Sequence, residues 1–240
     1  MAGASVLISA QELRDALQAG QPIVLLDCGF DLFDPAAGER AWRAGHLPGA
    51  RHAHLDRDLS AAKSARGPIE GGRHPLPSPA AWAARVAAWG IGPNTRVVVY
   101  DDQGGSYAAR AWWMFRWIGH EAVAVLDGGK GAWCAAGGAL ETADEAAAPV
   151  SVPAPDPAKD PATALATIDA PTLASRLGRV CLVDARAGER YRGETEPLDT
   201  RAGHIPGAVN RFFKDNLGPD GRFKSPQQLR REWLPLLPPG

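Results

Sequence analysis

A six-residue motif that occurs twice constrains this chain more than any other feature of its sequence. Gly-His-Leu-Pro-Gly-Ala at 45–50 returns as Gly-His-Ile-Pro-Gly-Ala at 203–208. An apolar run that ends in aspartate precedes each copy, at 23–27 and at 180–184. A Ser-Pro pair follows each copy, and Ser and Pro are typical of the N-cap and the first residue of a helix. These landmarks recur in the same order, which indicates a tandem duplication.

The first copy alternates helix signals with short apolar runs. The capping-box pattern from Ser9 to Glu12 predicts a helix over 11–17. The β-branched run at 96–100 predicts a buried parallel strand, followed by a polar loop at 101–106, a helix at 107–118 and a strand at 122–126. This alternation predicts an α/β fold, with a mostly parallel sheet flanked by helices in each copy. Because functional residues gather at the carboxyl ends of such strands, we expect the active-site position in the loop after Tyr100.

Composition between the copies suggests the domain boundaries. The stretch at 141–163 is rich in Ala, Pro and acidic residues, which is typical of an extended linker. We therefore expect an N-terminal domain at 1–140 and a C-terminal domain at 164–240. Counting from its Ser-Pro pair, the second copy would reach its third strand only beyond Gly240. We expect this second domain to be incomplete over these residues, and the chain to be a truncated form of a longer protein.

Charge and cysteine content exclude several classes of function. Lys and Arg number 26 against 27 Asp and Glu, so no global field draws the chain to nucleic acid or to an anionic membrane. No apolar stretch approaches the roughly 18–20 residues that span a bilayer. Three cysteines without a Cys-x-x-Cys pair argue against a disulfide framework or a zinc site. We expect a cytoplasmic protein without a nucleic-acid or membrane partner and without a metal.

Taken together, these motifs resemble the two-domain rhodaneses. The resemblance rests on the paired Gly-His-Leu/Ile-Pro-Gly-Ala loops, on the strand–loop–helix at 97–110 and on the Leu-Asp-Gly-Gly and Ala-Trp segments within 126–133. It implies tandem rhodanese-like domains and a sulfurtransferase that takes sulfane sulfur from thiosulfate or 3-mercaptopyruvate. The sulfur would pass through a cysteine persulfide to cyanide or a thiol acceptor. No metal or organic cofactor is implied, because the persulfide is itself the carrier.

The position of the nucleophile departs from this family pattern. In the family, a cysteine opens the strand–loop–helix of the second domain, and the matching first-domain position here is Asp101. Cys28 follows a strand end, Cys134 lies in a predicted helix and Cys181 lies inside a predicted strand, so none is expected to carry sulfur. We therefore expect the 240 residues by themselves to be inactive. The alternative is a non-catalytic rhodanese-like module that binds a partner or a small anion.

The resemblance also assigns residues to the substrate. Arg190 matches the arginine that binds the donor anion, and a planar guanidinium suits a sulfonate or a carboxylate. The alternative is a surface arginine as exposed as Arg186 and Arg192. Glu196 resembles the acidic residue that orients this arginine. Leu198-Asp199 stands where the mercaptopyruvate branch often has a second arginine, which leaves the preferred donor open.

Histidines supply the remaining candidates. Asp56 and His74 match first-domain positions that act as a proton relay in the mercaptopyruvate branch, although ordinary hydrogen bonding is an equal alternative. His46 and His204 lie inside the repeated motif, which favours a structural role in both copies. His52 and His54 have no third ligand nearby in the sequence, which argues against a metal site.

Overall fold

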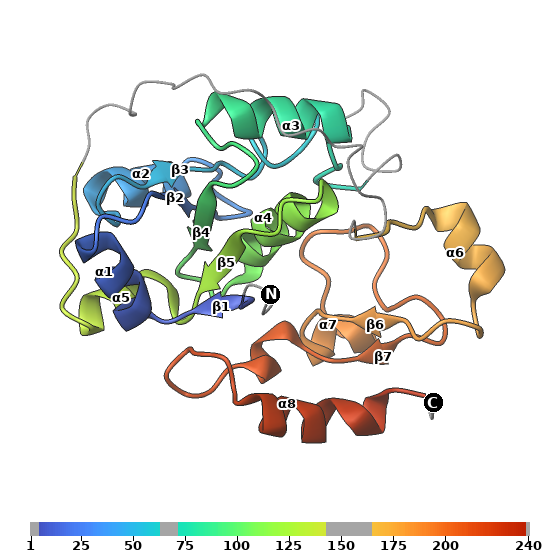
Figure 1. The fold of residues 1–240 in the computed structure, drawn as a ribbon. Helices are drawn as coiled ribbons and strands as arrows, with labels where there is room; N and C mark the ends of the chain where they lie inside the picture. The colour runs from blue at the N-terminus through green and yellow to red at the C-terminus, as the bar shows by residue number, and fades with distance from the viewer. Residues whose placement is uncertain (1–4, 63–71, 143–164, 239–240) are drawn as a thin grey trace. The chain divides into compact units, whose positions relative to one another are not determined.

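The computed structural model describes residues 5–62, 72–142 and 165–238. Its contacts divide the chain into two compact units, Met1–Ala166 and Thr167–Gly240, and each unit holds one copy of the repeated motif (Figure 1). The predicted linker lies outside the described residues except for its first two positions. Glu141, the first of them, pairs with His46 in an antiparallel bridge. The contacts of the first unit therefore reach at least to Glu141.

The first unit is built on a five-stranded sheet in which every pair of neighbours is parallel. The strand order is β1-β5-β4-β2-β3, so β4 lies at the centre. The bounds are β1 Leu7–Ile8, β2 Ile23–Asp27, β3 Arg51–His52, β4 Arg96–Tyr100 and β5 Val123–Leu126. The predicted α/β fold with a mostly parallel sheet is confirmed, and β2 and β4 begin and end at the predicted residues.

Helices connect these strands, as parallel pairing requires. Their bounds are α1 Ala10–Gln18, α2 Ala37–Ala44, α3 Pro79–Ala88, α4 Ser106–Trp117 and α5 Gly129–Ala135. The capping box predicted before α1 is present, because Ser9 and Glu12 satisfy each other's backbone N–H groups. Ser78 caps α3 by accepting a hydrogen bond from the backbone N–H of Ala81 at 3.2 Å.

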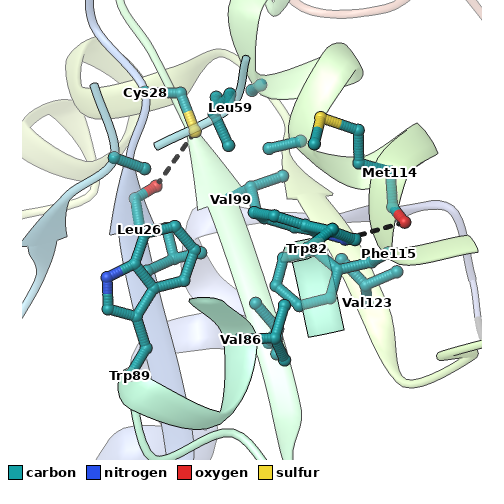
Figure 2. Close-up of a cluster of buried hydrophobic side chains, with 14 of the residues drawn as sticks. Leu26, Cys28, Leu59, Trp82, Val86, Trp89, Val99, Met114, Phe115 and Val123 are labelled. Carbon is teal, nitrogen blue, oxygen red and sulfur yellow. Dashed lines mark hydrogen bonds between the residues drawn. The ribbon is translucent and has the colours of Figure 1, made fainter. Parts of the chain in front are cut away.

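Side chains of β4 alternate between two hydrophobic clusters, one on each face of the sheet. Val97 and Val99 pack in the cluster that includes residues of α3 and α4, and Val98 and Tyr100 pack in the cluster that includes residues of α1 and α5. In the first cluster, the indole N–H of Trp82 donates to the carbonyl of Met114 at 2.9 Å and so joins α3 to α4 (Figure 2). Helices on both faces thus hold the carboxyl ends of the strands in place.

The second unit repeats the start of this pattern on a smaller scale. Strands β6 Val183–Asp184 and β7 Val209–Asn210 form a parallel pair. The helices are α6 Ala170–Arg176, α7 Gly188–Arg192 and α8 Pro226–Trp233, with 3₁₀ helices η1 Phe213–Asn216 and η2 Leu234–Leu236. The expectation that Cys181 lies inside a strand was wrong. Since β6 pairs over two residues only, the strand begins at Val183 and Cys181 precedes it.

Candidate functional site

The repeated motif forms the same hydrogen-bonded turn in both units. In the first unit, the His46 ring donates from Nδ1 to the Trp42 carbonyl at 2.8 Å, and Trp42 donates from its indole N–H to the Ala50 carbonyl at 2.9 Å. The rings of Trp42 and His46 stack with centroids 4.5 Å apart. This histidine therefore joins the preceding helix α2 to the turn.

The second unit builds this turn from a different aromatic residue. The His204 ring donates from Nδ1 to the Tyr191 carbonyl at 2.7 Å, and the Tyr191 hydroxyl donates to the Ala208 carbonyl at 2.7 Å. The two rings stack with centroids 3.8 Å apart. The contacts of both histidines are those of the structural role that the repeat favoured.

Corresponding groups also meet at the carboxyl ends of β2 in the first unit and of β6 in the second unit. Asp27, the last residue of β2, accepts a hydrogen bond from the Gly29 N–H at 2.9 Å, and His52 donates from Nε2 to the Gly29 carbonyl at 3.0 Å. In the second unit, Asp184 accepts from the Arg186 N–H at 2.9 Å, and the side-chain amide of Asn210 donates to the Arg186 carbonyl at 2.9 Å. The two copies therefore share the hydrogen bonds that hold the backbone just after these strands.

The loop after β4 folds around the carboxylate of Asp101. One oxygen of this buried group accepts from the N–H groups of Gln103 and Gly105, both at 2.8 Å. The other oxygen accepts from the N–H groups of Tyr107 and Ala108, both at 2.9 Å, at the start of α4. Backbone N–H groups arranged in this way form an anion site, which the protein's own carboxylate fills.

A glycine of the Leu-Asp-Gly-Gly segment allows this loop to pack closely. Gly129 has a φ of +58°, and a Cβ at this position would overlap the Asp101 carbonyl. Beside it, the Lys130 ammonium lies 3.0 Å from a carboxylate oxygen of Asp102. Close packing and this ion pair therefore fix the segment after β5 against the loop after β4.

All three cysteines are free, and none lies in such a loop. Cys28 is fully buried in the first hydrophobic cluster, where its thiol contacts the Leu26 carbonyl at 3.9 Å (Figure 2). Burial, and then the charge of Asp101, raise the pKa of the Cys28 thiol well above its ordinary value. The thiolate that a nucleophile needs is therefore disfavoured at Cys28. Cys134 and Cys181 are exposed.

The second unit brings Arg190 and Glu196 together, as the sequence suggested. Nη2 of Arg190, on α7, donates to the two carboxylate oxygens of Glu196 at 2.7 and 2.9 Å, and Nε lies 3.3 Å from one of them. Glu196 also accepts from the backbone N–H groups of Leu198 and Asp199. These bonds, above all those from Arg190, lower the pKa of Glu196. A carboxylate held from several directions orients the guanidinium.

The three arginines differ in exposure, which argues against the alternative that Arg190 is a surface arginine as exposed as its neighbours. The Arg190 side chain is 22% exposed. Arg186 is 29% exposed, because it pairs with Asp184 at 2.6 Å and donates to the Gly203 carbonyl at 2.7 Å. It also lies 3.4 Å from Glu196. Arg192 is 57% exposed and pairs with Glu194 at 2.6 Å. Sequence reasoning missed the sharing of Glu196 by two arginines, because Arg186 precedes α7 and helical spacing does not relate it to Arg190.

Asp56 and His74 also meet, in the first unit. Nδ1 of His74 lies 2.9 Å from a carboxylate oxygen of Asp56. The backbone N–H of Asp56 donates to Nδ1 of His54 at 3.1 Å, while Nε2 of His54 donates to the Pro35 carbonyl at 3.1 Å. His54 thus accepts at Nδ1 and holds the backbone of Asp56. This role of His54 was not predicted.

Two searches of the described residues bear on metals and membranes. Within residues 5–62, 72–142 and 165–238, no three His, Cys, Asp or Glu side chains gather as ligands of a metal ion would. No helix in the described part of the chain is both long and apolar enough to cross a bilayer.

This chain is similar to proteins of known family. The model of the rhodanese-like domain matches residues 9–136. The chain is 46% identical over 238 residues to a probable 3-mercaptopyruvate sulfurtransferase of Pseudomonas aeruginosa, and the match covers 96% of this chain and 79% of that protein. It is 41% identical over 218 residues to a putative thiosulfate sulfurtransferase of Mycobacterium tuberculosis H37Rv, covering 91% and 74%.

A solved structure has a similar fold. The 3-mercaptopyruvate sulfurtransferase from Leishmania major superposes with a TM-score of 0.76 at 25% sequence identity. The match covers 97% of this chain and 62% of the Leishmania chain, so the chain spans less than two thirds of that structure.

Proposed function

The chain belongs to the rhodanese family of sulfurtransferases, and on this premise we propose that it takes sulfane sulfur from thiosulfate or 3-mercaptopyruvate and passes it to cyanide or a thiol. One observation carries the proposal for this chain's own residues. Arg190, on α7 just after the carboxyl end of β6, is held by the carboxylate of Glu196, and the family resemblance expects the donor anion at this arginine. The similarity to sulfurtransferases named for both donors supports either one.

Arg190 would bind the anionic group of the donor. A guanidinium presents several N–H donors in one plane, which fits a carboxylate or a sulfonate. Its bonds to Glu196 are short, whereas the carboxylate of Asp199 lies 3.5 Å from Nη2 and its side chain is 54% exposed. The donor would therefore replace Asp199 rather than Glu196, and Glu196 would keep the guanidinium in place.

Sulfur transfer itself requires a cysteine thiolate. In the proposed cycle the thiolate attacks the outer sulfur of thiosulfate or the thiol sulfur of 3-mercaptopyruvate and forms a persulfide. The S–S bond of thiosulfate breaks to release sulfite, or the C–S bond of 3-mercaptopyruvate breaks to release the enolate of pyruvate, which takes up a proton. The acceptor then takes the outer sulfur from the persulfide and restores the thiolate. Asp101 shows how a loop of this kind cradles an anion through four backbone N–H groups. None of the three cysteines lies in such surroundings. Donor binding, rather than turnover, is therefore the step that these residues can test.

Asp56 and His74 would supply proton transfer. A carboxylate that accepts the Nδ1 proton of an imidazole fixes the tautomer and leaves acid–base exchange to Nε2. We propose that His74 in this form exchanges a proton with the acceptor or the leaving group during the reaction. The 2.9 Å contact between the two side chains supports the assignment.

The proposal extends to surroundings and partners. The substrates would be a small anionic sulfur donor and a thiophilic acceptor, without a nucleic-acid or membrane partner. A balanced charge supports this, with 26 basic and 27 acidic residues. Three free thiols support a reducing, cytoplasmic environment.

Donor binding tests the proposal on this chain. Calorimetry with 3-mercaptopyruvate and with thiosulfate should show saturable binding of at least one of them. Arg190→Ala should weaken that binding by about 10-fold to 100-fold, because a charge-assisted pair contributes about 1.5–3 kcal/mol. The matched control is Arg192→Ala, which removes an exposed arginine of the same helix and should leave the Kd within about twofold.

The same titrations can overturn the assignment. No saturable binding of either donor, or equal effects of Arg190→Ala and Arg192→Ala, would contradict the donor site. Arg186→Ala is not a clean control, since Arg186 lies 3.4 Å from Glu196 and shares this carboxylate with Arg190.

A further inference from the structure

Arg110, on the second turn of α4, bonds to two stretches of the first unit that are distant in sequence. Its Nε and Nη2 donate to the Leu59 carbonyl at 3.0 and 2.8 Å, and Nη2 donates to the His74 carbonyl at 3.0 Å. Longer contacts of Nη2 reach Ser60 Oγ at 3.4 Å and the Pro75 carbonyl at 3.5 Å. All of these acceptors are neutral oxygens. Arg110 therefore acts here as a multidentate hydrogen-bond donor.

These two stretches carry the two members of the proposed relay. Leu59 follows Asp56 by three residues, and His74 is bonded directly through its own carbonyl. The backbone between them includes residues 63–71, which lie outside the described part of the chain. One further described bond joins the stretches, from the Ala61 N–H to the Pro75 carbonyl at 2.9 Å. The guanidinium thus bridges both stretches close to the relay.

The helix that carries Arg110 is firmly anchored. The carboxylate of Asp101 accepts from the first-turn N–H groups of Tyr107 and Ala108. Ala111, Met114 and Phe115 are buried in the first hydrophobic cluster. Arg110 is half-buried, and this partial burial lowers the pKa of its guanidinium. A half-buried guanidinium on a helix anchored in this way is suited to holding backbone carbonyls at fixed positions.

We propose that Arg110 is a positioning residue, which keeps the His74 ring within hydrogen-bond distance of Asp56. The inference rests on the proposed relay role of this pair. On this inference the strand–loop–helix of the first unit has a function. Asp101, at the position of the family's sulfur-carrying cysteine, fixes the start of α4 through its hydrogen bonds. Helix α4 in turn places Arg110 against the backbone carbonyl of His74. A residue that fixes only the fold would leave the coupling between Asp56 and His74 intact, and the two roles can be separated on that basis.

The pKa of His74, measured by NMR on the full 240-residue chain, reports this coupling. Labelled histidine ring carbons resolve the six histidines, and His74→Gln identifies the His74 signal. An ionised carboxylate in contact with an imidazole raises its pKa by about one unit, so Asp56→Asn should lower the pKa of His74 by that amount. In an Arg110→Lys background, which keeps the charge but loses the planar fork, we expect Asp56→Asn to lower it by less than half as much.

A matched control comes from the same helix. Arg116 lies on α4 and pairs at 3.7 Å with the exposed Glu121, away from the His74 stretch. In an Arg116→Ala background, Asp56→Asn should lower the pKa of His74 as much as in the native chain. Circular dichroism and urea unfolding of each variant will identify variants that do not fold. If Arg110→Lys fails to fold, Arg110→Gln offers a neutral substitute in the same comparison.

Two results would overturn the inference. The first is an undiminished effect of Asp56→Asn in a folded Arg110 variant, which would leave Arg110 with a structural role alone. The second is an absent effect of Asp56→Asn in the native chain, which would show that the pair does not interact in solution. Both results are independent of donor binding at Arg190, so this inference and the proposed function can fail separately.

Discussion

The two copies of the repeated turn share their hydrogen bonds but differ in burial. Trp42 and His46 are 5% and 3% exposed in the first unit. In the second unit, their counterpart Tyr191 is half-buried and their counterpart His204 is exposed. Each pair nevertheless stacks, bonds the ring Nδ1 to the aromatic residue's carbonyl and bonds the aromatic polar group to the last alanine of the motif. The local sequence is therefore sufficient for the bonds, whereas the surrounding elements decide the burial.

The strand-end carboxylates extend this contrast to electrostatics. Burial raises the pKa of Asp27. The hydrogen bonds from the Arg186 side chain are the largest cause of a lowered pKa at Asp184. The two aspartates end corresponding strands and accept corresponding backbone bonds, yet their surroundings shift their titration in opposite directions. Equivalent positions in a duplication therefore need not keep equivalent chemistry.

Removing the aromatic residue of each turn should produce the largest difference between the units. Trp42→Ala should lower the free energy of unfolding of the first unit by about 3–5 kcal/mol, as expected for a buried aromatic side chain. Tyr191→Ala should cost the second unit about 1–2 kcal/mol, because its ring is only half-buried. Hydrogen exchange at the amides of Ala50 and Ala208, measured against urea concentration, reports each unit separately.

Conservative variants sharpen this prediction. Tyr191→Phe keeps the ring and removes one hydrogen bond, which should cost about 1 kcal/mol. Trp42→Phe removes a hydrogen bond and also part of a buried ring system, so it should cost more than Tyr191→Phe and less than Trp42→Ala. Equal losses for Trp42→Ala and Tyr191→Ala would show that burial does not distinguish the two turns.

Substitution of Asp101 should have the next largest effect on the free energy of unfolding, because its carboxylate occupies the anion site formed by four backbone N–H groups. Asp101→Asn keeps one oxygen as an acceptor but turns an NH₂ group toward two backbone N–H groups. Two buried donors without acceptors should cost about 2–4 kcal/mol of unfolding free energy, measured by urea unfolding. Asp102→Asn is the control, because Asp102 is 44% exposed and its ion pair with Lys130 should contribute less than about 1 kcal/mol. Similar losses of unfolding free energy in Asp101→Asn and Asp102→Asn would contradict the assignment of the four N–H groups to the Asp101 carboxylate.

The smallest effects should appear in the titration of the strand-end carboxylates, measured by NMR of the side-chain carboxyl carbons. Asp184 should titrate below the ordinary value of about 3.9 and Asp27 above it. Asp184 then stabilises its unit above pH 4, and this contribution is lost as the pH falls through its folded pKa. For Asp27 the sign is opposite: its contribution becomes less favourable as the pH rises from about 3.9 through its folded pKa.

Arg186→Gln is the control for this titration. It should return the pKa of Asp184 toward the ordinary value and leave Asp27 unchanged. If the pKa values of Asp27 and Asp184 shift in the same direction, the two units do not differ in the electrostatics of their strand-end carboxylates.

The sequence by itself determined the features that depend on local patterns. The duplication, the capping box at Ser9, the helix start at Ser78 and the bounds of β2 and β4 all follow from residue types at short spacings. The pairing of Arg190 with Glu196 followed from a family resemblance at two positions only six residues apart. Such features depend on neighbours along the chain, and neighbours can be counted in a sequence.

Only the tertiary structure decided the features that depend on packing between distant residues. The four N–H groups around Asp101 and the unequal exposure of Arg186 and Arg192 were not visible in any local pattern. Arg110 bonds to carbonyls 51 and 36 residues away, and a carbonyl is present at every position, so no residue type marks the partner. Burial and backbone contacts arise when separate elements meet, and for this reason they had to be read from the folded chain.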